Sequence, residues 1–146
     1  MMRNTLCLLA WIGALGAGVV RAQVPPQVNT IGATKDAYHF LDSLARSSFA
    51  RNVEDGACVP EYAVTDSSLE LRRVNRAKYD SADVRHIWAD FPGMCPWGQP
   101  TIHTHIEGTP GGSPFPSPTD RETARIRGTW NAILNVSTDG WRLLIY

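Results

Sequence analysis

The segment Thr101–Ile106 constrains this chain more than any other, because it combines the pattern of a buried strand with two histidines. Its sequence is Thr-Ile-His-Thr-His-Ile. Successive side chains of an extended strand point to opposite faces of a sheet. The apolar Ile102 and Ile106 therefore face one way, and His103 and His105 face the other. We expect a strand with the hydrophobic core on one face and two neighbouring imidazoles on the opposite face.

A long loop and a helix start follow this strand. Residues 108–118 contain four prolines and three glycines, a composition typical of a loop. Ser117 is a suitable N-cap, and Pro118 is tolerated in the first turn of a helix. Gly128 supplies a stop signal. The sequence therefore predicts a helix from about Pro118 to Arg127.

Asp120 falls in the first turn of this expected helix and can supply an oxygen ligand. With His103 and His105 it completes a His, His, Asp set. Three protein ligands of this kind leave one position of a tetrahedral zinc ion open, which is typical of a catalytic site rather than a structural one. The sequence therefore predicts a Zn²⁺ site at His103, His105 and Asp120.

The remaining pattern indicates a mixed α/β domain. Thr34 is a suitable N-cap, and apolar residues recur at helical spacing from Lys35 to about Phe49. Pro60 predicts an edge position or an irregularity in the strand that contains it. We expect extended segments at Glu54–Val64, Leu69–Val74, Ala132–Val136 and Trp141–Tyr146, the last two forming a hairpin. The expected architecture is a single central β-sheet flanked by helices.

The first part of the chain reads as an export signal. Residues 1–22 have a short basic start, an apolar stretch and small residues before a cleavage point, as secretory signal peptides do. The alternative is an uncleaved membrane anchor, but the apolar run is shorter than the roughly 20 residues of a spanning helix. We expect an extended leader at 23–33 and one domain at 34–146. The expected location is the periplasm or the outside of the cell, with membrane contact only through the signal segment.

Charge and cysteine content agree with an exported domain. Without the signal segment the chain carries 12 basic and 14 acidic residues, so it has no basic excess to attract nucleic acid. Cys58 and Cys95 then remain as a pair, which favours one disulfide in an oxidising compartment. The alternative is two buried free thiols that behave as small hydrophobic residues.

Hydrolysis at a zinc ion requires further groups near the metal. Zinc lowers the pKa of bound water to about 7, so water can attack a carbonyl at neutral pH. A carboxylate must then move protons, and a donor must stabilise the developing oxyanion. Glu54 and Glu61 are both candidates for the carboxylate, and Ser117 could be the donor.

The order His103-x-His105, a loop, then Ser117-x-x-Asp120 resembles the JAMM motif of the JAB/MPN/Mov34 zinc metallopeptidases, prokaryotic type. In that family a glutamate follows a helix and lies upstream of the histidines, near the start of the first core strand. In many bacterial members it stands four residues before a position that Cys58 would occupy here. The resemblance implies that Glu54 is the general acid/base and that Ser117 helps to hold the oxyanion. It also implies a JAB/MPN-like (cytidine-deaminase-like) fold over roughly residues 34–146.

Some positions depart from the family pattern. A proline usually follows the second histidine, where this chain has Ile106. The interval from His105 to Ser117 is longer than in eukaryotic members. Glu61 replaces a glycine that often ends the first strand, so it remains a rival to Glu54 for the catalytic role.

The resemblance implies an exported metallopeptidase that cleaves peptide or isopeptide bonds in a peptide or protein substrate. The compartment favours a peptidoglycan-related or secreted substrate. The alternative is a non-catalytic binding or metal-binding module of the same fold. Other hydrolase patterns are missing: the chain has no His-Glu-x-x-His helix, no Gly-x-Ser-x-Gly elbow and no Pro-Cys-x-x-Cys of the zinc deaminases.

Overall fold

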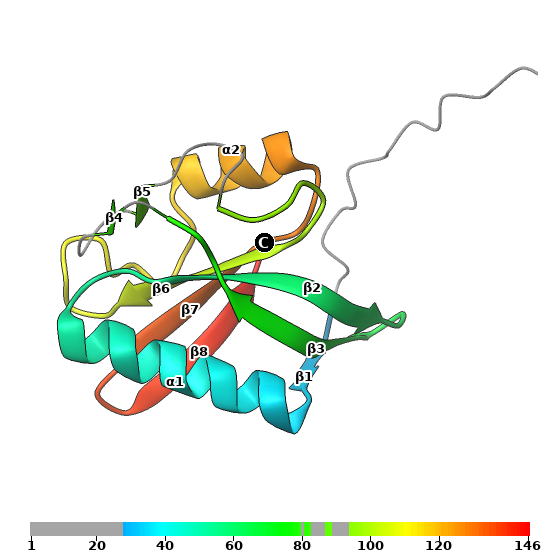
Figure 1. Ribbon diagram of the computed structural model, residues 1–146, viewed down its shortest axis with the longest axis horizontal. Helices are drawn as coiled ribbons and strands as arrows, with labels where there is room; N and C mark the ends of the chain where they lie inside the picture. The colour runs from blue at the N-terminus through cyan, green and yellow to red at the C-terminus, as the bar shows by residue number, and fades with distance from the viewer. Residues whose placement is uncertain (1–27, 80, 83–86, 89–93) are drawn as a thin grey trace, which may run out of the picture.

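A computed structural model describes residues 28–79, 81–82, 87–88 and 94–146 of the chain. Two helices and a six-stranded sheet dominate this part of the protein (Figure 1). The elements in chain order are β1 (Thr30–Ala33), α1 (Lys35–Arg51), β2 (Gly56–Val64), β3 (Ser68–Arg76), β4 (Ser81–Ala82), β5 (Ile87–Trp88), β6 (Thr101–Ile106), α2 (Pro118–Arg127), β7 (Ala132–Ser137) and β8 (Gly140–Ile145). The expected mixed α/β class is therefore confirmed, and the short β4–β5 ladder forms a second, separate sheet.

The six strands lie in the order β1-β3-β2-β6-β7-β8. Helix α1 covers one face of this sheet, and α2 lies on the other side (Figure 1). The main core lies under α1, where Leu41 and Leu44 pack with Leu71, Ile102 and Leu134. Strand β6 is central, so its Ile102 and Ile106 are buried as expected.

Helix α1 begins and ends where local chemistry dictates. The Thr34 side chain accepts a hydrogen bond from the backbone N–H of Ala37, as an N-cap does. The helix continues two residues beyond the expected end at Phe49. It stops at Asn52, which adopts the left-handed conformation with φ 53°, a geometry that asparagine tolerates better than most residues.

The first strands contain one irregularity and one addition. The register of β2 against β3 shifts between Cys58 and Tyr62, so the expected irregularity at Pro60 is confirmed. Strand β1 pairs in parallel with β3. The last four residues of the expected leader thus belong to the sheet. The expected signal peptide, residues 1–22, lies outside the described residues.

The second half of the sheet is built around a crossover. Strands β6 and β7 are adjacent and parallel, and α2 connects them, as parallel pairs require. β7 and β8 form the expected hairpin, with Ser137 opposite Gly140 at the turn. This topology places the loop at 107–117 and the start of α2 beyond the carboxyl end of β6.

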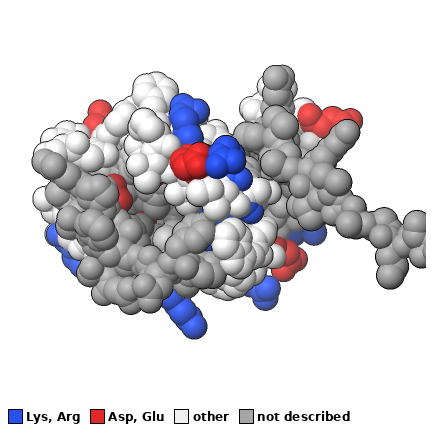
Figure 2. Space-filling model, turned by 90° about the horizontal axis from the view of Figure 1, so that it is seen from above, with Lys and Arg blue, Asp and Glu red and all other residues white. Residues whose placement is uncertain are grey.

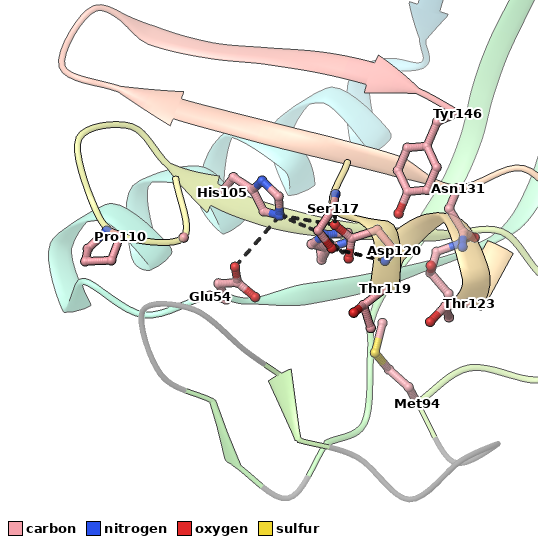
Figure 3. A pocket seen from close by; sticks show the side chains of 13 residues that line it. Glu54, Met94, His105, Pro110, Ser117, Thr119, Asp120, Thr123, Asn131 and Tyr146 are labelled. Atoms are coloured by element: carbon pink, nitrogen blue, oxygen red, sulfur yellow. Dashed lines mark hydrogen bonds and ion pairs between the residues drawn. The ribbon is translucent and has the colours of Figure 1, made fainter. Parts of the chain in front are cut away.

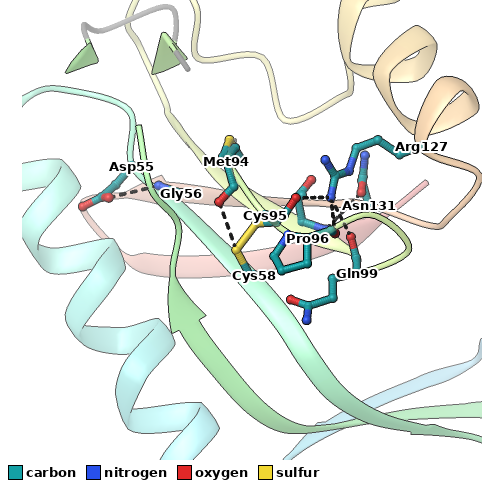
Figure 4. Close-up of a disulfide and its surroundings, with 10 residues drawn as sticks. Asp55, Gly56, Cys58, Met94, Cys95, Pro96, Gln99, Arg127 and Asn131 are labelled. Carbon is teal, nitrogen blue, oxygen red and sulfur yellow. Dashed lines mark hydrogen bonds between the residues drawn. A yellow bond between two sulfur atoms is a disulfide. The ribbon is translucent and has the colours of Figure 1, made fainter. Parts of the chain in front are cut away.

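A disulfide joins β2 to the loop before β6, as Figure 4 shows. The Cys58 and Cys95 Cα atoms lie 5.6 Å apart, within the usual range for a disulfide, so the expected pairing is confirmed. The buried Arg127 guanidinium at the end of α2 donates to the carbonyl oxygens of Cys95, Pro96 and Gln99. The bridge and this arginine together fix the loop between the two halves of the sheet.

The surface of the described part carries mixed charge. On the face in Figure 2, basic side chains stand singly or beside acidic ones. The whole chain has 14 basic and 14 acidic residues. Among the helices of the described ranges, none combines the length and the apolar character that a membrane span requires.

Candidate metal centre

Strand β6 and helix α2 bring the three expected ligands together. His103 Nε2 lies 3.0 Å from His105 Nε2 and 3.3 Å from Asp120 Oδ1. One ligand atom from each of the three residues can be chosen so that all lie within 4.8 Å of one another. Ligands of a tetrahedral zinc ion stand roughly 3.3 Å apart, given bonds near 2 Å. The group formed by His103, His105 and Asp120 could therefore hold a metal ion.

The ring of His105 is held in the orientation that a metal ligand needs. Its Nδ1 lies 2.5 Å from the carbonyl oxygen of Ser113, to which it donates. The lone pair of Nε2 then faces the other two residues of the group. A backbone carbonyl on the second ring nitrogen is the usual partner of a metal-bound histidine, because it fixes the tautomer.

Gly112 allows Ser113 to reach this position. A Cβ atom at Gly112 would stand 1.8 Å from the carbonyl oxygen of Ile106. The loop therefore folds back directly against the end of β6, and only glycine fits at the point of contact. The close approach carries the Ser113 carbonyl to the His105 ring.

Asp120 is oriented by the start of α2. Ser117 and Asp120 form a capping box: the serine hydroxyl accepts from the Asp120 N–H, and the aspartate accepts from the Ser117 N–H at 2.7 Å. That bond uses Oδ2, and Oδ1 faces His103. Ser117 is the confirmed N-cap, and its backbone aligns the carboxylate.

Burial and neighbouring charge set the pKa values of the group. Burial lowers the pKa of His105 below its ordinary value, and the adjacent His103 lowers it further. Burial opposes ionisation of Asp120, but bonds to His103 and Ser117 outweigh it and hold the pKa of that carboxyl well below its usual range. A neutral imidazole and an ionised carboxylate are the forms that bind metal ions.

The group opens into a cavity of about 410 Å³. Figure 3 shows Glu54, His105 and Asp120 around it, with Thr119, Thr123 and Asn131 toward α2 and β7. The Glu54 side chain is 5% exposed, and its Oε1 lies 3.9 Å from His105 Nε2. The structure thus brings Glu54 and Ser117 to the same cavity as the three expected ligands.

Glu61 occupies a different place. It is exposed on β2, opposite Arg73, and it is not among the residues that line this cavity. The bulge near Pro60 separates it from the start of the strand. Of the two candidate carboxylates, Glu54 is the one beside the histidines.

Asp55 fixes the position of Glu54. Its backbone N–H donates to the Thr104 hydroxyl, and its carbonyl oxygen accepts from the Thr104 N–H. Its buried carboxylate accepts from Arg51, Arg76 and Tyr79. Thr104 stands between the two histidines in sequence. This double contact therefore couples the backbone that carries Glu54 to the strand that carries His103 and His105.

Tyr146 also lines the cavity, and the sequence pattern did not identify it as a site residue. The strand alternation of β8 could have indicated it: residue 144 is opposite Ile133 and residue 142 opposite Asn135, on the histidine-bearing face. Burial raises the pKa of Tyr146, and the negative charges of Asp120 and Glu54 raise it further.

Comparison of the chain with models of known protein families found no match, and comparison with curated proteins found none.

Proposed function

We propose that the protein is a zinc-dependent metallopeptidase that hydrolyses peptide or isopeptide bonds. The observation that supports this most directly is one cavity that holds two histidines, an aspartate and a separate buried carboxylate, Glu54. The three-residue group alone would fit a simple metal-binding module. The additional carboxylate beside it supplies the proton-transfer group that hydrolysis needs.

The side chains present suit zinc. Two imidazoles and one carboxylate form a common ligand set of catalytic zinc sites. His103, His105 and Asp120 would hold the ion, with the Ser113 carbonyl and the Ser117 N–H as their outer partners. A zinc ion supplies Lewis acidity, which acidifies water and polarises the carbonyl group of the substrate.

The protein's own groups carry the proton. Glu54 would accept a proton from the attacking water and deliver it to the amine that leaves, so the carboxylate ends in its starting state. The Ser117 hydroxyl would donate a hydrogen bond to the carbonyl oxygen as negative charge develops there. Its Oγ accepts from the Asp120 N–H, which leaves the hydroxyl proton free to point into the cavity.

The motif resemblance to the JAB/MPN/Mov34 metallopeptidases supports the same assignment of roles. We further propose that the protein is exported, as the segment at 1–22 and the Cys58–Cys95 bridge suggest. Its substrate would then be a secreted or cell-wall peptide. The alternative function is a non-catalytic metal-binding module, for which the same three ligands would suffice.

Matched variants of Glu54 test the proposal. Glu54→Gln should keep zinc and fold and lose peptidase activity by at least about 100-fold, because the proton carrier is gone. His103→Ala should lose both zinc and activity. Zinc content by elemental analysis and cleavage of a fluorogenic peptide library measure the two properties.

Glu61→Gln is the matched control, since Glu61 is an exposed carboxylate on β2, the strand that follows Glu54. It should behave as the wild-type protein. Full activity of Glu54→Gln would exclude Glu54 as the base. A wild-type protein that holds zinc and cleaves nothing in the library would favour the binding module.

A further inference from the structure

Tyr146 lines the wall of the candidate metal cavity on the β8 side. In Figure 3 its ring extends from the end of β8 toward Ser117 and Asp120, with the hydroxyl at the near end. Glu54, Ser117 and Asp120 line the same cavity. The hydroxyl therefore lies among the groups proposed to hold the metal and to move the proton.

The backbone of Tyr146 is rigidly placed. Its N–H and carbonyl oxygen form a reciprocal pair of 2.9 Å hydrogen bonds with Asn131. The buried Asn131 side chain in turn accepts from the N–H of Thr101, the first residue of β6. Tyr146 is thus fixed to the strand that carries both histidines. A donor fixed before the substrate arrives need not be reorganised during the reaction.

The Tyr146 hydroxyl is available to donate a hydrogen bond to a bound ligand. A tyrosine hydroxyl is protonated at neutral pH, so it can donate a hydrogen bond. The hydroxyl has no hydrogen-bond partner among the described residues. A polar group fixed in a cavity and unengaged by the protein is suited to bind a ligand atom.

We propose that the Tyr146 hydroxyl is a second hydrogen-bond donor to the carbonyl oxygen of the substrate, acting beside Ser117. This inference rests on the proposed peptidase function. No proton leaves the tyrosine: its hydrogen bond strengthens as the carbonyl oxygen gains negative charge and weakens when the carbonyl re-forms. Ser117 also caps α2, so its removal changes two things at once, whereas removal of the Tyr146 hydroxyl changes one.

Tyr146→Phe tests the proposal, because the ring and the backbone bonds to Asn131 remain. The variant should retain thermal stability and bound metal. Its kcat for peptide cleavage should fall by about 100-fold, in line with the loss of one oxyanion donor, with little change in KM. With the Co²⁺-loaded protein, the affinity for acetohydroxamate, measured from the visible spectrum, should fall about tenfold, because this ligand also presents a carbonyl oxygen.

Tyr38→Phe is the matched control, since Tyr38 is a half-exposed tyrosine of α1, the helix on the opposite face of the sheet. It should match the wild-type protein in every measurement. Equal kcat and equal acetohydroxamate affinity of Tyr146→Phe and wild type would overturn the proposal, and so would loss of metal from the variant. If the wild-type protein cleaves no peptide, the proposed function fails, and the acetohydroxamate affinity alone decides the role of Tyr146.

Discussion

At the scale of single residues, the geometry of the centre depends on a glycine that touches no ligand. Gly112 lies against the carbonyl oxygen of Ile106, and the next residue supplies the carbonyl that orients His105. Backbone atoms on both sides of this contact leave no flexible side chain that could move away. The position of the loop, and with it the orientation of the His105 ring, therefore depends on Gly112 having no Cβ atom.

Gly112→Ala should weaken metal binding by about 10–100-fold, the usual cost of losing an outer partner of a metal-bound histidine. The reason is that the added methyl group displaces the Ser113 carbonyl from His105. Competition with a chelator of known zinc affinity measures the change. Gly32→Ala is the control, because a Cβ at Gly32 meets no atom within 4 Å. Unchanged zinc affinity of Gly112→Ala would show that the loop can shift without disturbing His105.

The sequence predicted much of this centre and missed its outer parts. Strand alternation placed both histidines on one face, and the N-cap signal at Ser117 placed Asp120 in the first helical turn. Both are local rules, so they hold before the chain folds. Tyr146 and the Ser113 carbonyl depend instead on the pairing of β8 with β7 and on how the loop folds back against β6. The alternation of β8 gives the face on which Tyr146 lies, but only the strand pairing brings that face beside the histidines.

At the scale of elements, the start of β2 is anchored by one buried carboxylate. The Asp55 side chain is fully buried, while its partners Arg51 and Arg76 are about half exposed. Asp55 also accepts from the N–H of Gly56 and from the Tyr79 hydroxyl. Helix α1, strand β3 and the start of β2 therefore meet at a single side chain.

Asp55→Asn should lower the free energy of unfolding by about 1.5–3 kcal/mol, the usual contribution of hydrogen bonds to a charged group. The amide keeps the shape but loses the charge and one acceptor. Urea denaturation measures the loss. Asp66→Asn, at an exposed turn, should change stability by less than about 0.5 kcal/mol. A loss at Asp55 no larger than at Asp66 would mean that the charge is not needed there.

The strand order itself lay beyond what the sequence could predict. Periodicity gave most of the strands and the first helix, because it reports which side of an element is buried. The cap signals at Ser117 and Gly128 gave the second helix. It does not report which strands are neighbours. The parallel pairing of β1 with β3 and the insertion of β6 between β2 and β7 arise from long-range contacts, and the resemblance to a JAB/MPN-like fold remains a prediction.

At the scale of the whole molecule, the disulfide crosses between distant parts of the chain. Cys58 and Cys95 are 37 positions apart, and a loop of this length gives up considerable entropy when it is closed in the unfolded state. Replacing both cysteines with alanine should lower the free energy of unfolding by about 2–4 kcal/mol. Chemical denaturation of the oxidised wild type and the double variant, each with and without reductant, measures this. A reductant effect on the variant would point to another cause.

The division of the sheet separates the candidate metal ligands from the proposed proton carrier. Strands β1, β3 and β2 with α1 use residues 30–64 and 68–76, and β6, β7 and β8 with α2 use residues 101–145. Within the sheet, only the three residue pairs between β2 and β6 join these halves. The core under α1 draws Leu41 and Leu71 from the first half and Ile102 and Leu134 from the second. The expected metal ligands all belong to the later-synthesised half, while Glu54 belongs to the earlier one. The candidate ligand set is thus complete within one half, and the proposed proton carrier reaches it only through the junction of β2 with β6.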